Sequence, residues 1–401
     1  MITPRDRLPT LDACWPTLAG PAVTVAHGAG PYENTRRALE PVDLSPARGK
    51  RVLLKPNAGR VAACGSGIVT HGQVVAAAVD AFREAGAEVV VGESPIVGVR
   101  VFEAFEAAGI AAMAEQRGCP LIDMDRRGCV EVDLSEGRAI RSIRVCEDLW
   151  GFDLVVSIPV MKMHMHTGVT LSVKNMKGCL WRRSKVELHM LPRMDGIDAK
   201  PIDVAIADMS SVLRPHLAII DGTVGMEGLG PSAGSPKELD AIVVGTDAFA
   251  ADAVACRLMG TRAEQIAHLR IGAERGYGVI DPDRIAVSPD GWQEWSQPFA
   301  APPENLTIAF PNVTVLDNNS CSACQSTLLL FLKKNRDQLF DYFPKDRPLH
   351  VAIGKGHAEL PEGTLCVGNC TINHRGCGIF VPGCPPVGSE ILRAIQEGHG
   401  E

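Results

Sequence analysis

The carboxyl-terminal part of the chain concentrates cysteines at spacings that suit a metal or cluster site. Seven of the 13 cysteines are scattered singly between Cys14 and Cys256, whereas six crowd into the segment Cys321–Cys384. Thiolates bind soft metals and iron–sulfur clusters, and four of them complete the protein ligands of a cubane. The sequence therefore predicts one [4Fe-4S] cluster as the cofactor of this segment.

Four of these cysteines form the predicted ligand set. They are Cys321, Cys324, Cys370 and Cys384. Two of them directly follow one expected strand and a third follows another, and the loops beyond the carboxyl ends of strands converge in open α/β sheets. Cys377 is the alternative ligand, because it lies on the same glycine-rich loop. Cys366 lies inside an expected strand and is predicted to be a small core residue.

Zinc and buried free thiols are the alternatives to a cluster. Structural zinc sites usually pair two Cys-x-x-Cys hairpins, but this chain has one such pair and two distant cysteines. A proline directly after a ligand cysteine, as in Cys384-Pro385, recurs in cluster-binding runs. The short run Val381–Pro386 also resembles the proximal-cluster loops of hydrogenase small subunits and of the related quinone oxidoreductase subunit, which implies cluster ligation.

A second group of functional side chains lies in the segment Pro159–Gly178, just beyond an expected strand. It contains Lys162, His164, His166, Lys174, Asn175 and Lys177. Lysines and imidazoles together predict an electropositive pocket for a carboxylate or a phosphate, and histidine can move protons near neutral pH. The alternative for each lysine is a helix cap or an ion pair at the surface.

These residues receive separate predicted roles. The predicted catalytic residues are His164, His166 and Lys174, and the predicted substrate-binding residues are Lys55, His71, Lys162, Asn175 and Lys177. His164 is the preferred proton donor or acceptor, and Lys174 is the preferred anion anchor. His189 and His216 are predicted to be structural.

Both groups depend on alternating strands and helices of the kind that builds parallel sheets. Expected strands cover residues 51–57, 87–92, 120–123, 153–158, 216–221, 241–245, 313–316, 350–354 and 364–368. Expected helices cover residues 72–86, 102–116, 203–213, 248–259, 263–275, 326–338 and 387–396. The pattern predicts a larger, Rossmann-like α/β domain with a mainly parallel sheet, and a smaller carboxyl-terminal α/β domain that carries the cysteine cluster.

The predicted organisation has four parts. An N-terminal extension covers residues 1–48, the larger α/β domain residues 49–297, a proline-rich linker residues 298–312 and the iron–sulfur domain residues 313–401. Because both functional groups follow strands, we expect the Lys/His segment to face the cysteines across a crevice between the domains.

Eight motifs of the larger domain occur in an order that resembles domain-of-unknown-function family 362 (DUF362), over roughly residues 50–290. They are Leu54–Asn57, Thr70-His71, Glu84–Ala87, Gly92–Ser94, Ile158–His164, Leu171–Gly178, Ile220–Gly222 with Gly225–Pro231, and Asp247–Val254. The resemblance implies an α/β fold, frequent association with iron–sulfur clusters and no settled activity. Many members carry ferredoxin-type CxxCxxC runs, which this chain lacks, so a single specialised cluster is expected.

A fainter similarity connects the chain to the nickel-pincer lactate racemases. It rests only on the comparable order of His164, Lys174 and His189. That family uses histidine and lysine on an α/β scaffold for hydride or proton chemistry, which the similarity would imply here.

Composition limits the classes of partner. The 401 residues carry a net charge of −7 without a Lys/Arg-rich run, and nucleic-acid binding usually needs a basic face. No apolar stretch approaches the roughly 20 residues that span a bilayer, and no signal sequence is evident. We expect a cytoplasmic protein with reduced thiols, no nucleic-acid partner and no membrane partner. A redox protein partner and a homodimer are left open.

The sequence thus favours a [4Fe-4S]-dependent enzyme, an oxidoreductase or a lyase, that acts on a small anionic substrate. A carrier has no need of converging lysines and histidines. A non-enzymatic electron carrier or cluster-carrying adaptor is the first alternative, and a zinc-stabilised binding protein is the second.

Overall fold

The computed structural model describes residue 15 and residues 21–192, 194–302 and 310–399. The chain divides into two compact units, Met1–Pro302 and Pro303–Glu401, called unit 1 and unit 2 below. The predicted linker includes residues 303–309, which lie outside the described residues, as do residues 1–14 and 16–20 of the predicted N-terminal extension.

Unit 1 is built on a large mixed sheet. Its central strands run, in spatial order, β12 (Ala286–Ser288), β1 (Ala22–His27), β11 (Ser235–Gly245), β10 (Leu217–Glu227), β7 (Leu154–Ile158), β2 (Arg51–Pro56), β3 (Glu88–Glu93) and β4 (Leu121–Asp123). Neighbours from β10 to β4 pair in parallel, whereas β11 is antiparallel to both β1 and β10. The predicted α/β class with a mainly parallel sheet is confirmed.

The segment expected as an N-terminal extension contributes to this sheet. β1 pairs with β11 and β12, and α1 (Gly30–Leu39) follows it. Val23 and Val25 are buried in the core, so the strand is anchored by apolar side chains. The short run Ala22–His27 is rich in β-branched residues, and its partner strands come from distant parts of the sequence. The larger domain therefore begins earlier than residue 49.

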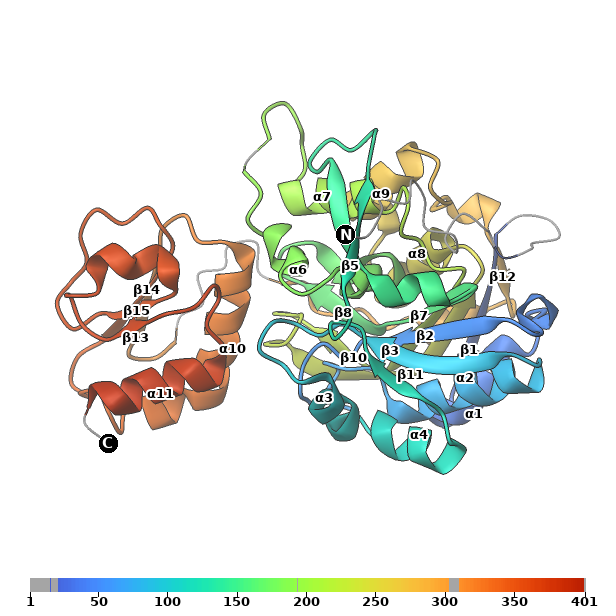
Figure 1. The fold of residues 1–401 in the computed structure, drawn as a ribbon, viewed down its shortest axis with the longest axis horizontal. Coiled ribbons are helices and arrows are strands. Elements are labelled where there is room, and N and C mark those ends of the chain that lie inside the picture. Colours follow the sequence, from blue (N-terminus) through green and yellow to red (C-terminus); the bar gives the residue numbers. More distant parts are fainter. Residues whose placement is uncertain (1–14, 16–20, 193, 303–309, 400–401) are drawn as a thin grey trace. The chain divides into compact units, whose positions relative to one another are not determined.

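Helices cover both faces of the sheet (Figure 1). They are α1, α2 (Gly72–Glu84), α3 (Val101–Ala107), α4 (Ile110–Arg117), α5 (Ser172–Asn175), α6 (Ser184–Glu187), α7 (Pro201–Met209), α8 (Ala248–Leu258) and α9 (Ala267–Glu274). Alternate residues of β2 enter two separate cores: Val52 and Leu54 pack with α1 and α2, and Leu53 packs on the side of α7 and α8. This alternation is the consequence of the two-residue period of a strand.

Two differences from the expected elements have local causes. Gly109 adopts a left-handed φ of 73° and ends α3, so the helix expected over residues 102–116 is two short helices. The segment expected as a loop after β7 forms a hairpin of β8 (Val160–His164) and β9 (Gly168–Thr170), in which β8 also pairs with β10. A separate ribbon pairs β5 (Cys129–Asp133) with β6 (Ser142–Cys146).

Unit 2 has a parallel sheet of its own. Its strands lie in the order β13 (Val313–Asp317), β14 (Leu349–Ile353), β15 (Leu365–Val367) and β16 (Phe380–Val381). Two helices, α10 (Ser322–Leu339) and α11 (Gly388–Gly398), pack through Leu328, Leu332, Ile391 and Ile395 onto the same apolar core. Among the described helices of both units, none combines the length and the apolar character that a membrane span requires.

Candidate functional site

The β8–β9 hairpin and α5 carry the predicted lysines and histidines of unit 1. In the hairpin register, Lys162 lies opposite Thr170 and His164 lies opposite Gly168. Lys174 is on α5, and Lys177 is in the short 3₁₀ turn that follows it. The hairpin therefore holds the side chains of this short segment in a fixed register.

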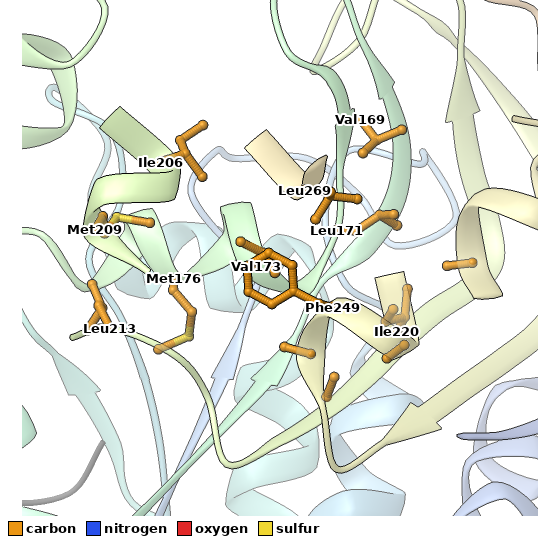
Figure 2. Close-up of a cluster of buried hydrophobic side chains, with 14 of the residues drawn as sticks. Val169, Leu171, Val173, Met176, Ile206, Met209, Leu213, Ile220, Phe249 and Leu269 are labelled. Atoms are coloured by element: carbon orange, nitrogen blue, oxygen red, sulfur yellow. The ribbon is translucent and has the colours of Figure 1, made fainter. Parts of the chain in front are cut away.

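Apolar residues of the same segment fix its orientation. Leu171, Val173 and Met176 are buried in the core that contains Phe249 and Leu269 (Figure 2). Lys174 lies between Val173 and Met176 in the sequence. Because residues on opposite sides of a helical turn face opposite ways, the burial of these two directs Lys174 away from that core.

The start of α5 is held by a carboxylate from α8. The Oδ1 and Oδ2 atoms of Asp252 accept hydrogen bonds from the backbone N–H groups of Ser172 and Val173, at 2.7 and 3.0 Å. Burial raises the pKa of Asp252 to about 8. This contact fixes the first turn of the helix that presents Lys174.

A buried ion pair lies at the beginning of a polar chain of contacts. The Nζ of Lys55 is 2.9 Å from Oε2 of Glu93, and the side chains are 0% and 2% exposed. The same Nζ donates to Oδ1 of Asn175 at 3.2 Å and to the carbonyl of Pro56 at 3.0 Å. An ammonium group has three donors, so all the donors of Lys55 are used.

Asn175 is equally committed to internal bonds. Its Oδ1 accepts from Lys55 and from Nδ2 of Asn57 at 3.0 Å, and its Nδ2 donates to the carbonyl of Lys55 and to Oγ of Ser157. In this structure Lys55 and Asn175 use these hydrogen-bonding groups to position their neighbours. Their predicted substrate-binding roles stay predictions.

Lys162 receives its position from this chain of contacts. Its Nζ donates to Oδ1 of Asn57 at 2.7 Å and to the carbonyl of Ile68 at 2.6 Å, which leaves one donor of three. Burial lowers the pKa of Lys162 well below its usual value, and the nearby charges of Lys174 and Arg60 lower it further.

The other two lysines also have neutral partners. The Nζ of Lys174 donates to Oγ1 of Thr170 at 3.1 Å, and burial lowers the pKa of Lys174 to about 8. Lys177 contacts Nε2 of His189, and burial lowers its pKa well below the usual value. His189, expected from the sequence to be structural, therefore lies beside this cluster of lysines.

The hydrogen bonds of His164 indicate its tautomer. Its Nδ1 accepts from the backbone N–H groups of His166 and Thr167, at 3.1 and 3.4 Å, so the ring proton is assigned to Nε2. Burial, followed by the charge of Lys174, holds the pKa of His164 well below its usual value. The ring is therefore a neutral donor at Nε2, with the ring of His166 at a centroid distance of 5.8 Å.

His71 and Arg60 lie on the loop between β2 and α2. His71 is the N-cap of α2: its Nδ1 accepts from the N–H of Gln73 at 3.1 Å, and its own N–H donates to Asp221 at 2.7 Å. Arg60 was missed in the sequence. Burial lowers the pKa of Arg60 to about 10, and its charge acts on Lys162. The sequence signal that could have identified Arg60 is its position shortly after the carboxyl end of β2, three residues beyond Asn57.

The four predicted cluster ligands of unit 2 follow the carboxyl ends of three strands. Cys321 is the N-cap of α10 and Cys324 is in its first turn, after β13. Cys370 is in a 3₁₀ turn after β15, and Cys384 comes after β16. This is the arrangement that the strand positions predicted.

Asn369 ties the last two of these loops together. Its N–H donates to the carbonyl of Gly383 at 2.8 Å, and its Oδ1 accepts from the N–H of Gly383 at 2.8 Å. The N–H of Gly368 donates to the carbonyl of Val381 at 2.8 Å. The loops that carry Cys370 and Cys384 are therefore held side by side.

The thiols influence one another. Cys324 donates a hydrogen bond to the sulfur of Cys321, and this bond is the main cause that lowers the pKa of Cys321 to about 6. The same hydrogen bond is the main cause that raises the pKa of Cys324, and Cys370 and Cys384 raise it further. The four sulfurs thus lie within electrostatic reach of each other.

Four thiols make a soft donor set that fits an iron–sulfur cluster. Within the described part of the chain, no three Cys, His, Asp or Glu side chains are arranged to hold a single metal ion. A cubane distributes its ligands over four irons, so it requires a wider arrangement than four ligands around one zinc.

Cys377, the alternative ligand, lies in different surroundings. Burial, followed by the charge of Cys377, raises the pKa of Cys366 to about 11, and the Sγ of Cys366 is directed at the carbonyl of His374. The carbonyl of Cys377 accepts from the N–H of Gly363 at 2.6 Å. The structure thus groups Cys377 with Cys366. The prediction that the Lys/His segment and the cysteines share a crevice stays a prediction.

Comparison with known proteins gives the family. The model of the family described as "Domain of unknown function (DUF362)" matches residues 52–257, which is just over half of the chain. The motifs had indicated this family, and the match confirms it. The thylakoid-associated protein sll1697 of Synechocystis sp. is 29% identical over 254 residues, covering 61% of this chain and 76% of that protein.

One solved structure also matches. The lactate racemase apoprotein from Thermoanaerobacterium thermosaccharolyticum is 13% identical, with a TM-score of 0.39, covering 95% of this chain and 82% of that chain. A similarity of this degree says nothing about a shared reaction.

Proposed function

The chain belongs to the DUF362 family, and we propose that it is an iron–sulfur enzyme that binds a small anion at Lys162, Lys174 and Lys177 and transfers a proton at His164. Redox or lyase chemistry on a carboxylate or a phosphate is the reaction class that these residue types favour.

One observation carries the proposal: the buried Lys162 and the half-buried Lys174 and Lys177 lie together, and among the described residues none of them has a carboxylate partner. Among the described residues, Lys162, Lys174 and Lys177 make hydrogen bonds only to neutral groups. A buried charge without a counter-ion is costly, and the lowered pKa values of all three lysines express that cost. An anion removes the cost by supplying the missing charge.

His164 supplies the proton chemistry. Its Nδ1 is occupied by two backbone donors, so only Nε2 is available to a ligand. A neutral imidazole that presents Nε2–H can donate a proton or a hydrogen bond to an oxygen that gains negative charge in the reaction.

Cys321, Cys324, Cys370 and Cys384 are the residues that would hold the [4Fe-4S] cluster. When bound, such a cluster supplies one-electron transfer, or a Lewis-acidic iron if one ligand position stays open.

Anion binding is tested by calorimetry on the full chain, prepared anaerobically, with acetate, succinate and inorganic phosphate as probes. We expect at least one of these anions to bind, and Lys174→Met to weaken it by about 10- to 100-fold, as for the loss of a charged hydrogen bond. Lys50→Met is the matched control, because Lys50 is half-exposed on the surface of unit 1. Absence of binding by all three anions, or an unchanged affinity in Lys174→Met, would contradict the proposal.

Proton transfer is tested separately, by incubating acetate and succinate with the protein in deuterated water and following the exchange of their carbon-bound hydrogens by nuclear magnetic resonance. We expect exchange catalysed by the protein, and a loss of about 10²- to 10⁴-fold in His164→Gln, the range for a general acid or base. If His164→Gln exchanges as fast as the unaltered protein, the role of His164 is wrong.

A further inference from the structure

A guanidinium group without a partner lies beside the lysines of unit 1. Among the described residues, the half-buried Arg60 makes neither a hydrogen bond nor an ion pair, so its guanidinium donors are open to a ligand. It lies on the loop whose Asn57 and Ile68 hold the Nζ of Lys162. Its charge acts on Lys162, so the two groups belong to one electrostatic cluster.

The loop that carries Arg60 is held firmly at several points. The N–H of Asn57 donates to Oγ1 of Thr70 at 2.8 Å, and that hydroxyl donates to the carbonyl of Ile158 at 2.6 Å. The N–H of Ile96 donates to the carbonyl of Gly59 at 3.2 Å. Gly67, with φ at 69°, packs so closely on the carbonyl of Gly225 that a Cβ would lie 2.3 Å from that oxygen. The position of Arg60 is thus set by its backbone, without help from its own side chain.

Nearby acids do not balance the cluster. Glu93 is matched by Lys55, whose donors are all used. Asp203, whose charge acts on Lys174, is 3.2 Å from Nδ1 of His268. Among the described residues, Arg60 and the three lysines are thus four basic side chains that form no hydrogen bond or ion pair with a carboxylate.

Building on the proposed function, we infer that the anion of this site carries a phosphate group and that Arg60 is its anchor. A phosphate has a charge of about −1.5 to −2 at pH 7 and three acceptor oxygens, whereas a carboxylate has one charge and two oxygens. The arginine fork matches two oxygens of a phosphate at once, and lysines act as point charges on the remaining oxygen. A single carboxylate would leave most of the four cations uncompensated.

The inference is tested by calorimetry on the full chain with pyrophosphate, inorganic phosphate and acetate. We expect both phosphates to bind at least about tenfold more tightly than acetate, a difference of about 1.4 kcal/mol. Arg60→Gln should weaken phosphate binding by about tenfold or more and acetate binding by less than about threefold. Arg60→Lys, which keeps the charge but loses the fork, should lie between the two.

Arg100→Gln is the matched control, because its side chain is 85% exposed and pairs with Glu103 outside the cluster. It should bind all three anions like the unaltered protein. Thermal melting of each variant checks that it is folded, and Arg60→Lys takes the place of Arg60→Gln if the latter is not.

The outcomes separate this inference from the proposed function. Acetate that binds as tightly as phosphate, or an Arg60→Gln variant that weakens both anions equally, overturns the phosphate inference while the anion site remains. If neither acetate nor the phosphates bind, the anion site and the phosphate inference both fail.

Discussion

The two candidate sites of this protein are held in opposite ways. In unit 1, neutral side chains and backbone carbonyls fix the cations: Asn57 holds Lys162, and Thr170 holds Lys174. In unit 2, the thiols interact chiefly with each other, and Cys370 is exposed. The first site is organised by the protein itself, whereas the second has the character of a site that the proposed cluster would complete.

The two sites gain their stability from different interactions. A site that is preorganised by packed strands keeps its geometry when its ligand leaves, because close packing in the surrounding core holds its residues in place. A thiol site at the ends of short strands gains much of its stability from metal–sulfur bonds. Loss of the cofactor should therefore affect unit 2 and spare unit 1. The two units can be followed separately, since all five tryptophans lie before Pro302.

The largest effect is expected for a cluster ligand. Cys324→Ser should reduce the iron content from about four atoms per chain to less than one, because one ligand of the cubane is lost. Iron and sulfide analysis after anaerobic purification measures this, and tryptophan fluorescence should show an unchanged unfolding of unit 1. Cys64→Ser, at an exposed position of unit 1, is the control and should keep its iron. Stoichiometric zinc without iron in the unaltered protein would refute the cluster.

The next effect concerns the buried pair of unit 1. Glu93→Gln leaves the charge of Lys55 buried without a counter-ion, which should lower the free energy of unfolding by about 3–5 kcal/mol. Denaturant titration followed by tryptophan fluorescence measures it.

The comparison variant is Glu84→Gln, which breaks the exposed pair of Arg36 with Glu84, whose side chain is 62% exposed. It should cost at most about 1 kcal/mol, as surface pairs do. Equal costs in the two variants would mean that the pair of Lys55 and Glu93 does not organise the site.

Much of the fold could be predicted because its strands are apolar and regular. The expected strands at residues 153–158 and 51–57 match β7 and β2 within one residue at each end. β1 was missed, since its pairing with β11 joins residues more than 200 positions apart. A local sequence pattern indicates which residues can form a strand, but it does not indicate which distant strand will pair with them in a sheet.

The candidate site was predicted less completely, for a similar reason. The lysine and histidine types were informative, but their hydrogen bonds depend on distant residues. Glu93 uses one donor of Lys55 across 38 positions, and Asn175 uses another across 120 positions. These contacts show that Lys55 and Asn175 also support the structure around the site, which their residue types alone do not reveal. Arg60 was overlooked because a lone arginine in a loop shows its missing partner only in three dimensions.

A smaller effect is expected from pH. With sulfate as the probe, whose charge is constant above pH 6, binding should weaken by about tenfold between pH 7 and pH 9, because Lys174, with a pKa of about 8, loses its proton in this range. Only the protonated, positively charged Lys174 attracts the anion, so its contribution to the affinity is present below pH 8 and is lost above it. Calorimetry at each pH measures the change.

Lys174→Arg sharpens the result, since arginine stays charged throughout this range. Between pH 7 and pH 9 its affinity should fall by clearly less than the roughly tenfold expected for the unaltered protein, and any remaining fall reports Lys162 and Lys177, whose pKa values are also lowered. Identical pH profiles for the two proteins would exclude Lys174 from the anion site.

The smallest effect is expected for the cysteine that the sequence left as an alternative ligand. Cys377→Ser should keep about four irons per chain, because Cys377 lies beside Cys366 while Cys370 interacts with Cys384 and Cys321. Cys370→Ser, measured in parallel by the same iron and sulfide analysis, should lose most of its iron. A full cluster in Cys370→Ser together with a depleted one in Cys377→Ser would exchange the two residues as ligands. The loop held by Asn369 would then have to rearrange when the cluster binds, and the contrast between a preorganised unit 1 and a metal-dependent unit 2 would become sharper.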